Sequence, residues 1–284
     1  MTPGLIVGVL LVQAATSRGS ILDGPEWTRL DGRPARSQFE CVAYREDFWS
    51  VSSGGGSVVV RPRSTARVYD PLPFSIKPEK DQGGDRRVLA VSDGWLVGFD
   101  AGEFGGGLWW FDSEGRRSRR LRPPRTARDP GDPYGAENVL GFATVEGRSL
   151  VLVGLNHLDG RSGRVFETER TDEGRWNLVP VAILDASPEA WISESDRLLV
   201  LTEGGMWTLE TSRPAQHSVS LDLGPVGPAN SLVRGDDGFL YIGLRHYVLG
   251  LDLLDDERSE VWFAPSACSS LVMRERCDCV RPRP

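Results

Sequence analysis

Asp237-Gly-Phe-Leu-Tyr-Ile-Gly243 joins an acidic residue and a glycine to a short apolar and aromatic run. The Asp-Gly pair favours a tight hairpin turn, and the residues after it favour a β-strand. The same order recurs at 93–98, 146–154 and 196–201, with a weaker copy at 47–51. A turn followed by an apolar strand is therefore the repeating element of this sequence.

Each copy is followed by a second apolar strand, and further strands flank each pair. The second strands are expected at 57–60, 108–111, 164–168, 206–209 and 247–251. Equivalent strands recur about every 40 to 55 residues, a period typical of stacked four-stranded units. The pattern predicts five such units, at 39–75, 87–122, 138–184, 188–223 and 229–264.

This repeat resembles that of β-propeller proteins over residues 39–264. One four-stranded blade cannot bury both of its faces, so the resemblance implies a single closed domain. We expect an all-β fold, a β-propeller of five four-stranded blades, with six blades or a large β-sandwich as alternatives. Segments 25–34 and 266–284 are candidates for a closing strand or a sixth blade. The signatures of WD40 repeats and a regular Asp-box are absent, so the pattern indicates no particular family.

Composition limits the classes of partner. Of 284 residues, 39% are hydrophobic and 26% are charged, which suits a globular protein with a core. The net charge of -7 argues against nucleic acid as a partner, because phosphate binding needs a basic surface. No stretch is apolar and long enough to cross a bilayer. We expect a monomer that does not span a membrane and uses no cofactor.

The N-terminus resembles a secretory signal. The apolar run 5–12 precedes small residues, and Val12 and Ala14 fit the pattern of a cleavage site, although no positive side chain precedes Arg18. We expect a signal peptide over 1–15, an extension with a possible closing strand over 16–38, and a cysteine-containing tail over 265–284. The mature protein would be secreted or periplasmic. The alternative is a mis-set start or a buried first strand.

Four cysteines remain after such a cleavage: Cys41, Cys268, Cys277 and Cys279. An even number in an exported chain predicts two disulfides. Neighbouring blades at the ring junction would bring Cys41 close to the tail, so we predict that it pairs with Cys277 or Cys279 and that Cys268 takes the other. Four reduced thiols are the alternative. A metal site is not expected, because no second cysteine pair or histidine cluster is present.

Long loops indicate where a ligand could bind. The loops at 99–107 and 156–163 and the linker 122–137 are expected on the same face of the ring. The candidate binding residues that they carry are Asp100, Glu103, Arg125, Tyr134, Asn156, His157 and Asp159. The alternative is that these are simply long solvated loops.

Two classes of function remain open. No catalytic or phosphate-binding motif is present, which favours a non-catalytic binding or interaction module for a protein or glycan ligand. The alternative is a glycan- or ester-directed hydrolase or lyase on the loop face between the second and third blades. Its acid and base would come from Asp100, Glu103, Asp159 or His157, with two carboxylates close together.

Overall fold

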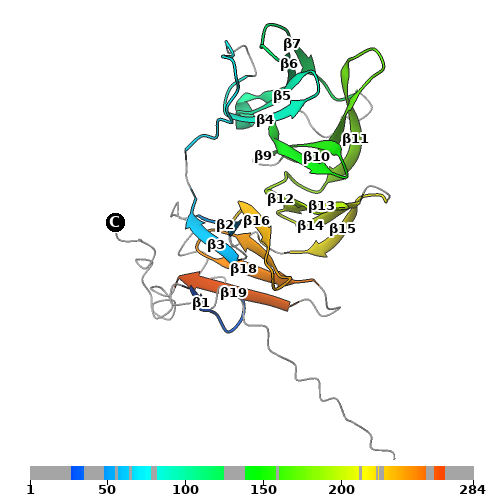
Figure 1. Ribbon diagram of the computed structural model, residues 1–284. Helices are drawn as coiled ribbons and strands as arrows, with labels where there is room; N and C mark the ends of the chain where they lie inside the picture. The colour runs from blue at the N-terminus through cyan, green and yellow to red at the C-terminus, as the bar shows by residue number, and fades with distance from the viewer. Residues whose placement is uncertain are drawn as a thin grey trace, which may run out of the picture.

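Antiparallel strands make up most of the computed structural model, which describes residues 27–34, 48–54, 57–63, 66–77, 82–124, 138–157, 160–210, 213–221, 223, 227–253 and 259–265. These residues form nineteen strands in five sheets, and one short 3-10 helix, η1 (Gly102–Phe104). Figure 1 shows the sheets following one another along an arc. The predicted all-β fold class is confirmed.

The last four predicted units each form one antiparallel meander whose strands pair in chain order. The first contains β4 (Asp85–Val91), β5 (Gly94–Asp100), β6 (Gly106–Asp112) and β7 (Ser118–Leu121). The second contains β8 (Val139–Val145), β9 (Arg148–His157), β10 (Gly160–Arg170) and β11 (Trp176–Leu184). The third contains β12 (Ala190–Ser193), β13 (Arg197–Thr202), β14 (Gly205–Glu210) and β15 (Gln216–Ser220). The fourth contains β16 (Ser231–Arg234), β17 (Leu240–Gly243), β18 (Val248–Asp252) and β19 (Ser259–Pro265). Meanders of this kind are the blades of a β-propeller.

The turns that the repeat predicts connect the first and second strands of the blades. Glu146 and Gly147 join β8 to β9 with φ values of 48° and 78°. Two consecutive positive φ values produce the tight turn whose twist matches an antiparallel hairpin. In the fourth blade, the Asp237 carboxylate accepts a hydrogen bond from the N–H of Phe239 at 3.1 Å, which fixes the turn before β17.

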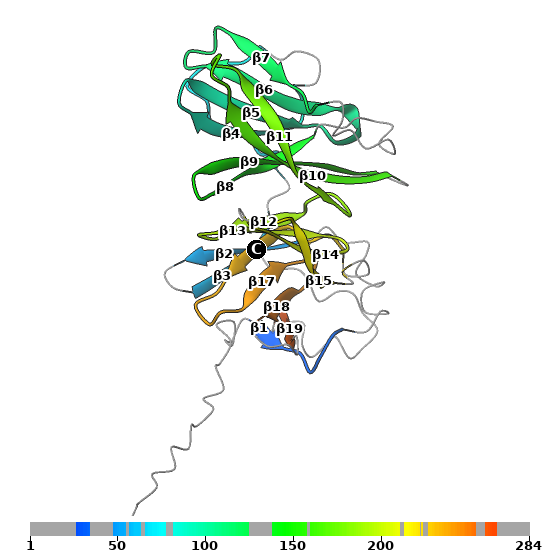
Figure 2. The ribbon, with the colours of Figure 1, turned by 90° about the vertical axis from the view of Figure 1, so that its right-hand side faces the viewer.

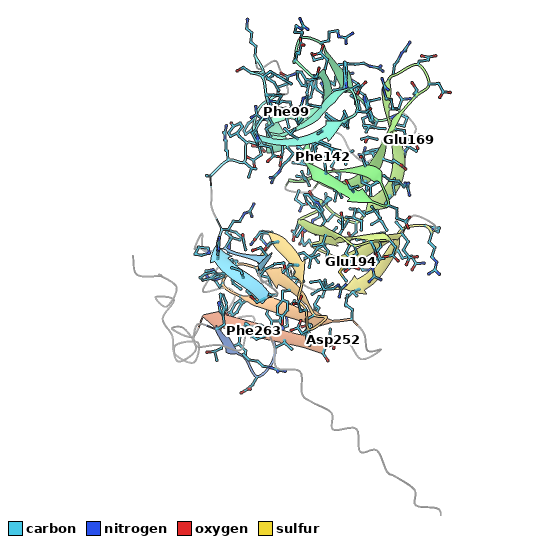
Figure 3. The ribbon with its side chains drawn as sticks, in the orientation of Figure 1. Phe99, Phe142, Glu169, Glu194, Asp252 and Phe263 are labelled. Carbon is cyan, nitrogen blue, oxygen red and sulfur yellow. The ribbon has the colours of Figure 1, made fainter. Side chains whose placement is uncertain are left out.

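Apolar side chains fill the spaces between successive sheets (Figure 3). One cluster between the first two meanders includes Leu96 of β5 and Val151 of β9, and the next includes Leu152 of β9 and Leu198 of β13. Leu96 and its neighbour Val97 are both 0% exposed. Since adjacent residues of a strand point to opposite faces, β5 is buried on both sides, as a strand inside a stack of sheets should be.

Close packing at glycine sets the order of the sheets. A Cβ at Gly98 of β5 would overlap the side chain of Val139, the first residue of β8 in the next sheet. A Cβ at Gly243 of β17 would overlap the backbone of Trp49 in β2 (Trp49–Gly54). The first strand of one sheet therefore packs against the second strand of the sheet before it. By this contact β2 follows the fourth meander along the arc.

The first predicted unit differs from its expected form. The described part contains two strands of it, β2 and β3 (Ser57–Pro62), and the weak repeat copy at 47–51 was expected to be a second strand. In the structure β2 packs against β16 and β17, as β8 packs against β4 and β5, and so takes the position of a first strand. Residues 35–47 lie outside the described residues, and the number of blades stays a prediction.

The N-terminal segment contacts two sheets, the β2–β3 sheet and the β16–β19 sheet. β1 (Trp27–Arg29) pairs antiparallel with β19 as a fifth strand on the outer edge of the last sheet (Figure 2). Its Trp27 ring meets the Trp49 ring of β2 edge to face, with centroids 5.0 Å apart. The N–H of Trp49 also donates to the carbonyl of Leu244 at 3.0 Å. β1 thus contacts both β19 and β2, at the junction between the β16–β19 sheet and the β2–β3 sheet.

Residues 66–77 cover the remaining face of the β4–β7 sheet. Tyr69 forms a parallel bridge with Arg86 at the inner edge of β4. Further along, Leu72, Phe74 and Ile76 pack on an apolar cluster of β5 and β6, and the Phe74 ring lies 5.7 Å from that of Phe111. Figure 1 shows this linker crossing from β3 to the β4–β7 sheet. The linker thus buries an apolar face that in other blades packs against a neighbouring sheet.

Candidate functional site

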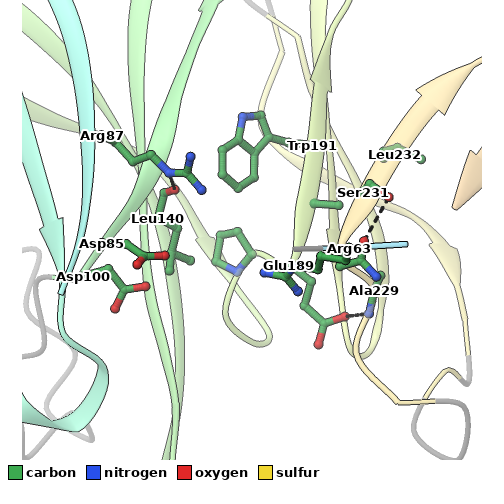
Figure 4. A pocket seen from close by; sticks show the side chains of 13 residues that line it. Arg63, Asp85, Arg87, Asp100, Leu140, Glu189, Trp191, Ala229, Ser231 and Leu232 are labelled. Carbon is green, nitrogen blue, oxygen red and sulfur yellow. Dashed lines mark hydrogen bonds between the residues drawn. The ribbon is translucent and has the colours of Figure 1, made fainter. Parts of the chain in front are cut away.

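A cavity of about 420 Å³ lies among the starts of the first strands of four sheets (Figure 4). We call it the axial cavity, because the first strands of propeller blades line the central axis. The polar and aromatic residues that line it are Arg63, Asp85, Arg87, Asp100, Glu189, Trp191, Asn230 and Ser231. Ordinary ligand sites have volumes of roughly 300–1,000 Å³, so a small molecule fits.

One wall of the axial cavity carries two carboxylates side by side. Asp85 of β4 and Asp100 of β5 are directly opposite in the strand register. The N–H of Val68 donates to Asp85 Oδ1 at 3.2 Å, and that of Gly102 donates to Asp100 Oδ1 at 2.9 Å. Burial and the Asp85 charge raise the pKa of Asp100, and the Gly102 bond and Arg87 oppose this rise. This wall therefore concentrates negative charge where solvation is poor.

The opposite wall carries a third carboxylate, that of Glu189, immediately before β12 (Figure 4). Its Oε2 accepts a hydrogen bond from the N–H of Ala229 at 2.8 Å. Burial raises the pKa of Glu189 to about 7, with Glu203 adding to the rise and Arg161 opposing it. The carboxyl group consequently titrates near neutral pH.

Asn230 adds a donor to the same wall. Ser50 and Ser231 donate their hydroxyls to Asn230 Oδ1 at 3.2 and 3.1 Å, and Ser231 accepts from the N–H of Val51 at 2.8 Å. Both donors fix the amide so that Nδ2 is directed away from them. Asn230 Nδ2 is buried and has no acceptor among the described residues. A buried amide N–H without an acceptor costs free energy in the folded protein.

An aromatic ring and a guanidinium lie beside the carboxylates. Trp191 Nε1 donates to the carbonyl of Phe142 at 3.2 Å, and its ring lies over Gly141, where a Cβ would overlap it. Arg87 Nε donates to the carbonyl of Leu140 at 3.3 Å. Figure 4 shows the Arg87 and Trp191 side chains on the same side of the cavity. The fixed indole gives a flat apolar surface among polar groups.

The residues predicted from the loops separate in the structure. Asp100 lines the axial cavity. Glu103 lies on η1 and is exposed, and the Asn156 side chain accepts a hydrogen bond from the N–H of Ser187 at 3.1 Å. His157 ends β9, but its side chain lies outside the described part. Outside the described residues as a whole lie Arg125, Tyr134, Asp159, Cys41, Cys268, Cys277 and Cys279.

Most of the cavity residues lie outside the long loops from which the sequence predicted a site. Asp85, Glu189 and Asn230 all stand at or just before the first strand of a unit. A signal was present in the sequence, since polar residues recur at the start of strands that are otherwise apolar. In a propeller these positions face the axis.

Comparison with known proteins gives similarity of fold alone. No family model and no curated protein matches the chain. A solved streptogramin B lyase is similar at 12% identity and a TM-score of 0.35, with 76% of this chain and 70% of that one covered. A Bombyx mori GH32 β-fructofuranosidase in complex with sucrose is similar at 13% identity and a TM-score of 0.29, over 66% and 52% of the two chains. The extracellular domain of a putative one-component system from B. thetaiotaomicron is similar at 11% identity and a TM-score of 0.29, over 74% and 36%.

These three proteins have propeller-type folds. This chain spans about half of the second and about a third of the third. The similarity to these proteins concerns the fold alone.

No helix among the described residues is long and apolar enough to cross a membrane. Within the same part of the chain, no group of three or more His, Cys, Asp or Glu side chains is placed to hold a metal ion.

Proposed function

We propose that this protein is a non-catalytic binding module whose axial cavity takes a small polyhydroxylated ligand of about monosaccharide size. The observation that carries this proposal is one cavity lined by carboxylates beside a fixed indole ring, each carboxylate having one oxygen that accepts no hydrogen bond from the described residues. Carboxylates accept pairs of hydroxyl groups, and an aromatic face packs against the C–H groups of a sugar ring.

The frame around the cavity suits binding. Asp85, Glu189 and Asn230 are attached to strands of different sheets, and the packing between the sheets holds their backbones in place. A site whose groups are fixed before binding loses little conformational entropy when it takes up a ligand. Polar groups brought together from three sheets can contact three sides of one small molecule.

Calorimetric titration of the purified protein with a panel of monosaccharides tests the proposal. We expect saturable binding of at least one neutral hexose, weakened at least about tenfold by Glu189→Gln, which removes a charged acceptor from the cavity. Glu173→Gln is the matched control, because it removes one carboxylate from an exposed turn between β10 and β11. Equal weakening by both variants, or binding by neither the wild type nor the control, contradicts the proposal.

A hydrolase or lyase is the second candidate. The observation in its favour is the Asp85–Asp100 cross-strand pair, in which one pKa is raised while both carboxylates face the cavity. A pair of this kind can divide the roles of general acid and base. Release of product from aryl glycosides or esters, lost in Asp100→Asn, would favour this candidate over binding alone.

We also propose that the chain is exported and acts as a monomer outside the cytoplasm. The proposal rests on the apolar run 5–12, the cleavage pattern and the even number of cysteines. Mass measurement of the exported protein should place the mature N-terminus near Ala15, and non-reducing peptide mapping should link Cys41 to Cys277 or Cys279. A retained Met1 or four free thiols would contradict this proposal.

A further inference from the structure

We propose that the ligand of the axial cavity carries a protonated amine, which binds between Asp85 and Asp100. This inference rests on the proposed function and names the charged group by which the cavity would select among polyhydroxylated ligands. The ligand class is thus an amino sugar or a similar aminated polyol.

The positions of Asp85 and Asp100 favour a single group bound between them. Directly opposed residues on adjacent antiparallel strands have Cβ atoms about 5 Å apart and project to the same face of the sheet. Asp85 and Asp100 are opposed in this way, and both line the cavity. Each uses one oxygen to accept a backbone N–H, from Val68 and Gly102 respectively. The second oxygen of each accepts no hydrogen bond from the described residues, so a single group between them reaches both.

The negative charges of the cavity carboxylates favour a cation. Like charges directly opposed on neighbouring strands destabilise a sheet, and burial increases the repulsion. Within the described part of the chain, none of Asp85, Asp100 and Glu189 forms an ion pair, whereas Glu203, whose charge acts on Glu189, pairs with Arg161 at 3.0 Å. The charge of Arg87 acts on Asp100, but its Nε donates to the carbonyl of Leu140. A ligand cation would relieve the repulsion that the protein leaves in place.

The opposite wall of the axial cavity carries a further carboxylate. Glu189 faces the pair from across the cavity, with one oxygen held by the N–H of Ala229 (Figure 4). An ammonium group has three N–H donors and one positive charge, so it can donate to the second oxygens of Asp85 and Asp100 while the Glu189 carboxylate adds negative potential from the opposite wall. A carboxylated ligand would meet three carboxylates instead, and the cations among the described residues that line the cavity are Arg63 and Arg87.

Three probes that differ only at C6 test the inference: 6-amino-6-deoxy-D-glucose, D-glucose and D-glucuronic acid. Titrations at pH 7.5 should give a dissociation constant about tenfold lower for the amine than for glucose, and about tenfold higher for the acid. In Asp100→Asn the ratio between amine and glucose should fall to about one. Glu173→Gln is the matched control and should keep the wild-type ratio.

The outcomes separate the two proposals. Equal affinities for the amine and for glucose, or a preference for the amine that persists in Asp100→Asn, would overturn this inference while leaving sugar binding intact. A rise in melting temperature caused by Ca²⁺ alone, and lost in Asp100→Asn, would also overturn it by assigning the carboxylate pair to a metal. Binding of none of the three probes by a folded wild-type protein would instead overturn the proposed function.

Discussion

Replacement of Glu189 by glutamine should stabilise the protein in a pH-dependent manner. The glutamate has its ordinary pKa of 4.5 in the unfolded chain, and burial raises the value to about 7 in the folded protein. Between these values the folded protein holds a proton that the unfolded chain has released, so stability falls as the pH rises through this window and stays low above it. Integrated from pH 5 to pH 8, the loss amounts to up to about 2.5 kcal/mol.

Glutamine has the same shape, keeps an acceptor for the Ala229 N–H and does not titrate. The free energy of unfolding of Glu189→Gln, relative to wild type, should therefore increase by up to about 2.5 kcal/mol between pH 5 and pH 8. Urea unfolding followed by tryptophan fluorescence at both pH values, without ligand, measures this difference. Glu173→Gln, which removes a carboxylate that is 72% exposed, is the matched control. A difference for Glu189→Gln that is the same at both pH values would refute the argument from burial.

Two further substitutions test the packing of the sheets. Gly98→Ala should lower the free energy of unfolding by roughly 1–3 kcal/mol, because the new methyl group overlaps Val139 of the next sheet; an unchanged urea midpoint would show that these sheets do not pack as described. Asp93→Ala should lower it by roughly 2–3 kcal/mol, since Asp93 accepts from the indole N–H groups of Trp110 and Trp176 at 3.2 and 2.9 Å; a loss below about 0.5 kcal/mol, measured in the same way, would contradict that role.

The candidate site shows where interpretation from sequence succeeds and fails. Asp100 was predicted because it begins a long loop after a repeat strand, and loops carry function often enough to be searched first. Asp85 and Glu189 were missed, although each lies at or next to the start of a predicted unit. The distance between these two side chains across the cavity depends on which sheets surround the axis. No local sequence pattern encodes this distance.

The sequence by itself determined the hairpins and the order of strands within each blade. Pairs such as Glu146-Gly147 favour their turn through local backbone geometry, and alternating apolar residues define strands within a few residues of one another. Only the tertiary structure decided that β2 takes the place of a first strand, that the linker 66–77 covers one face of the β4–β7 sheet, and that three carboxylates share a cavity. These features arise from contacts between residues far apart in the chain, whose free energy depends on how whole sheets pack together rather than on any short segment.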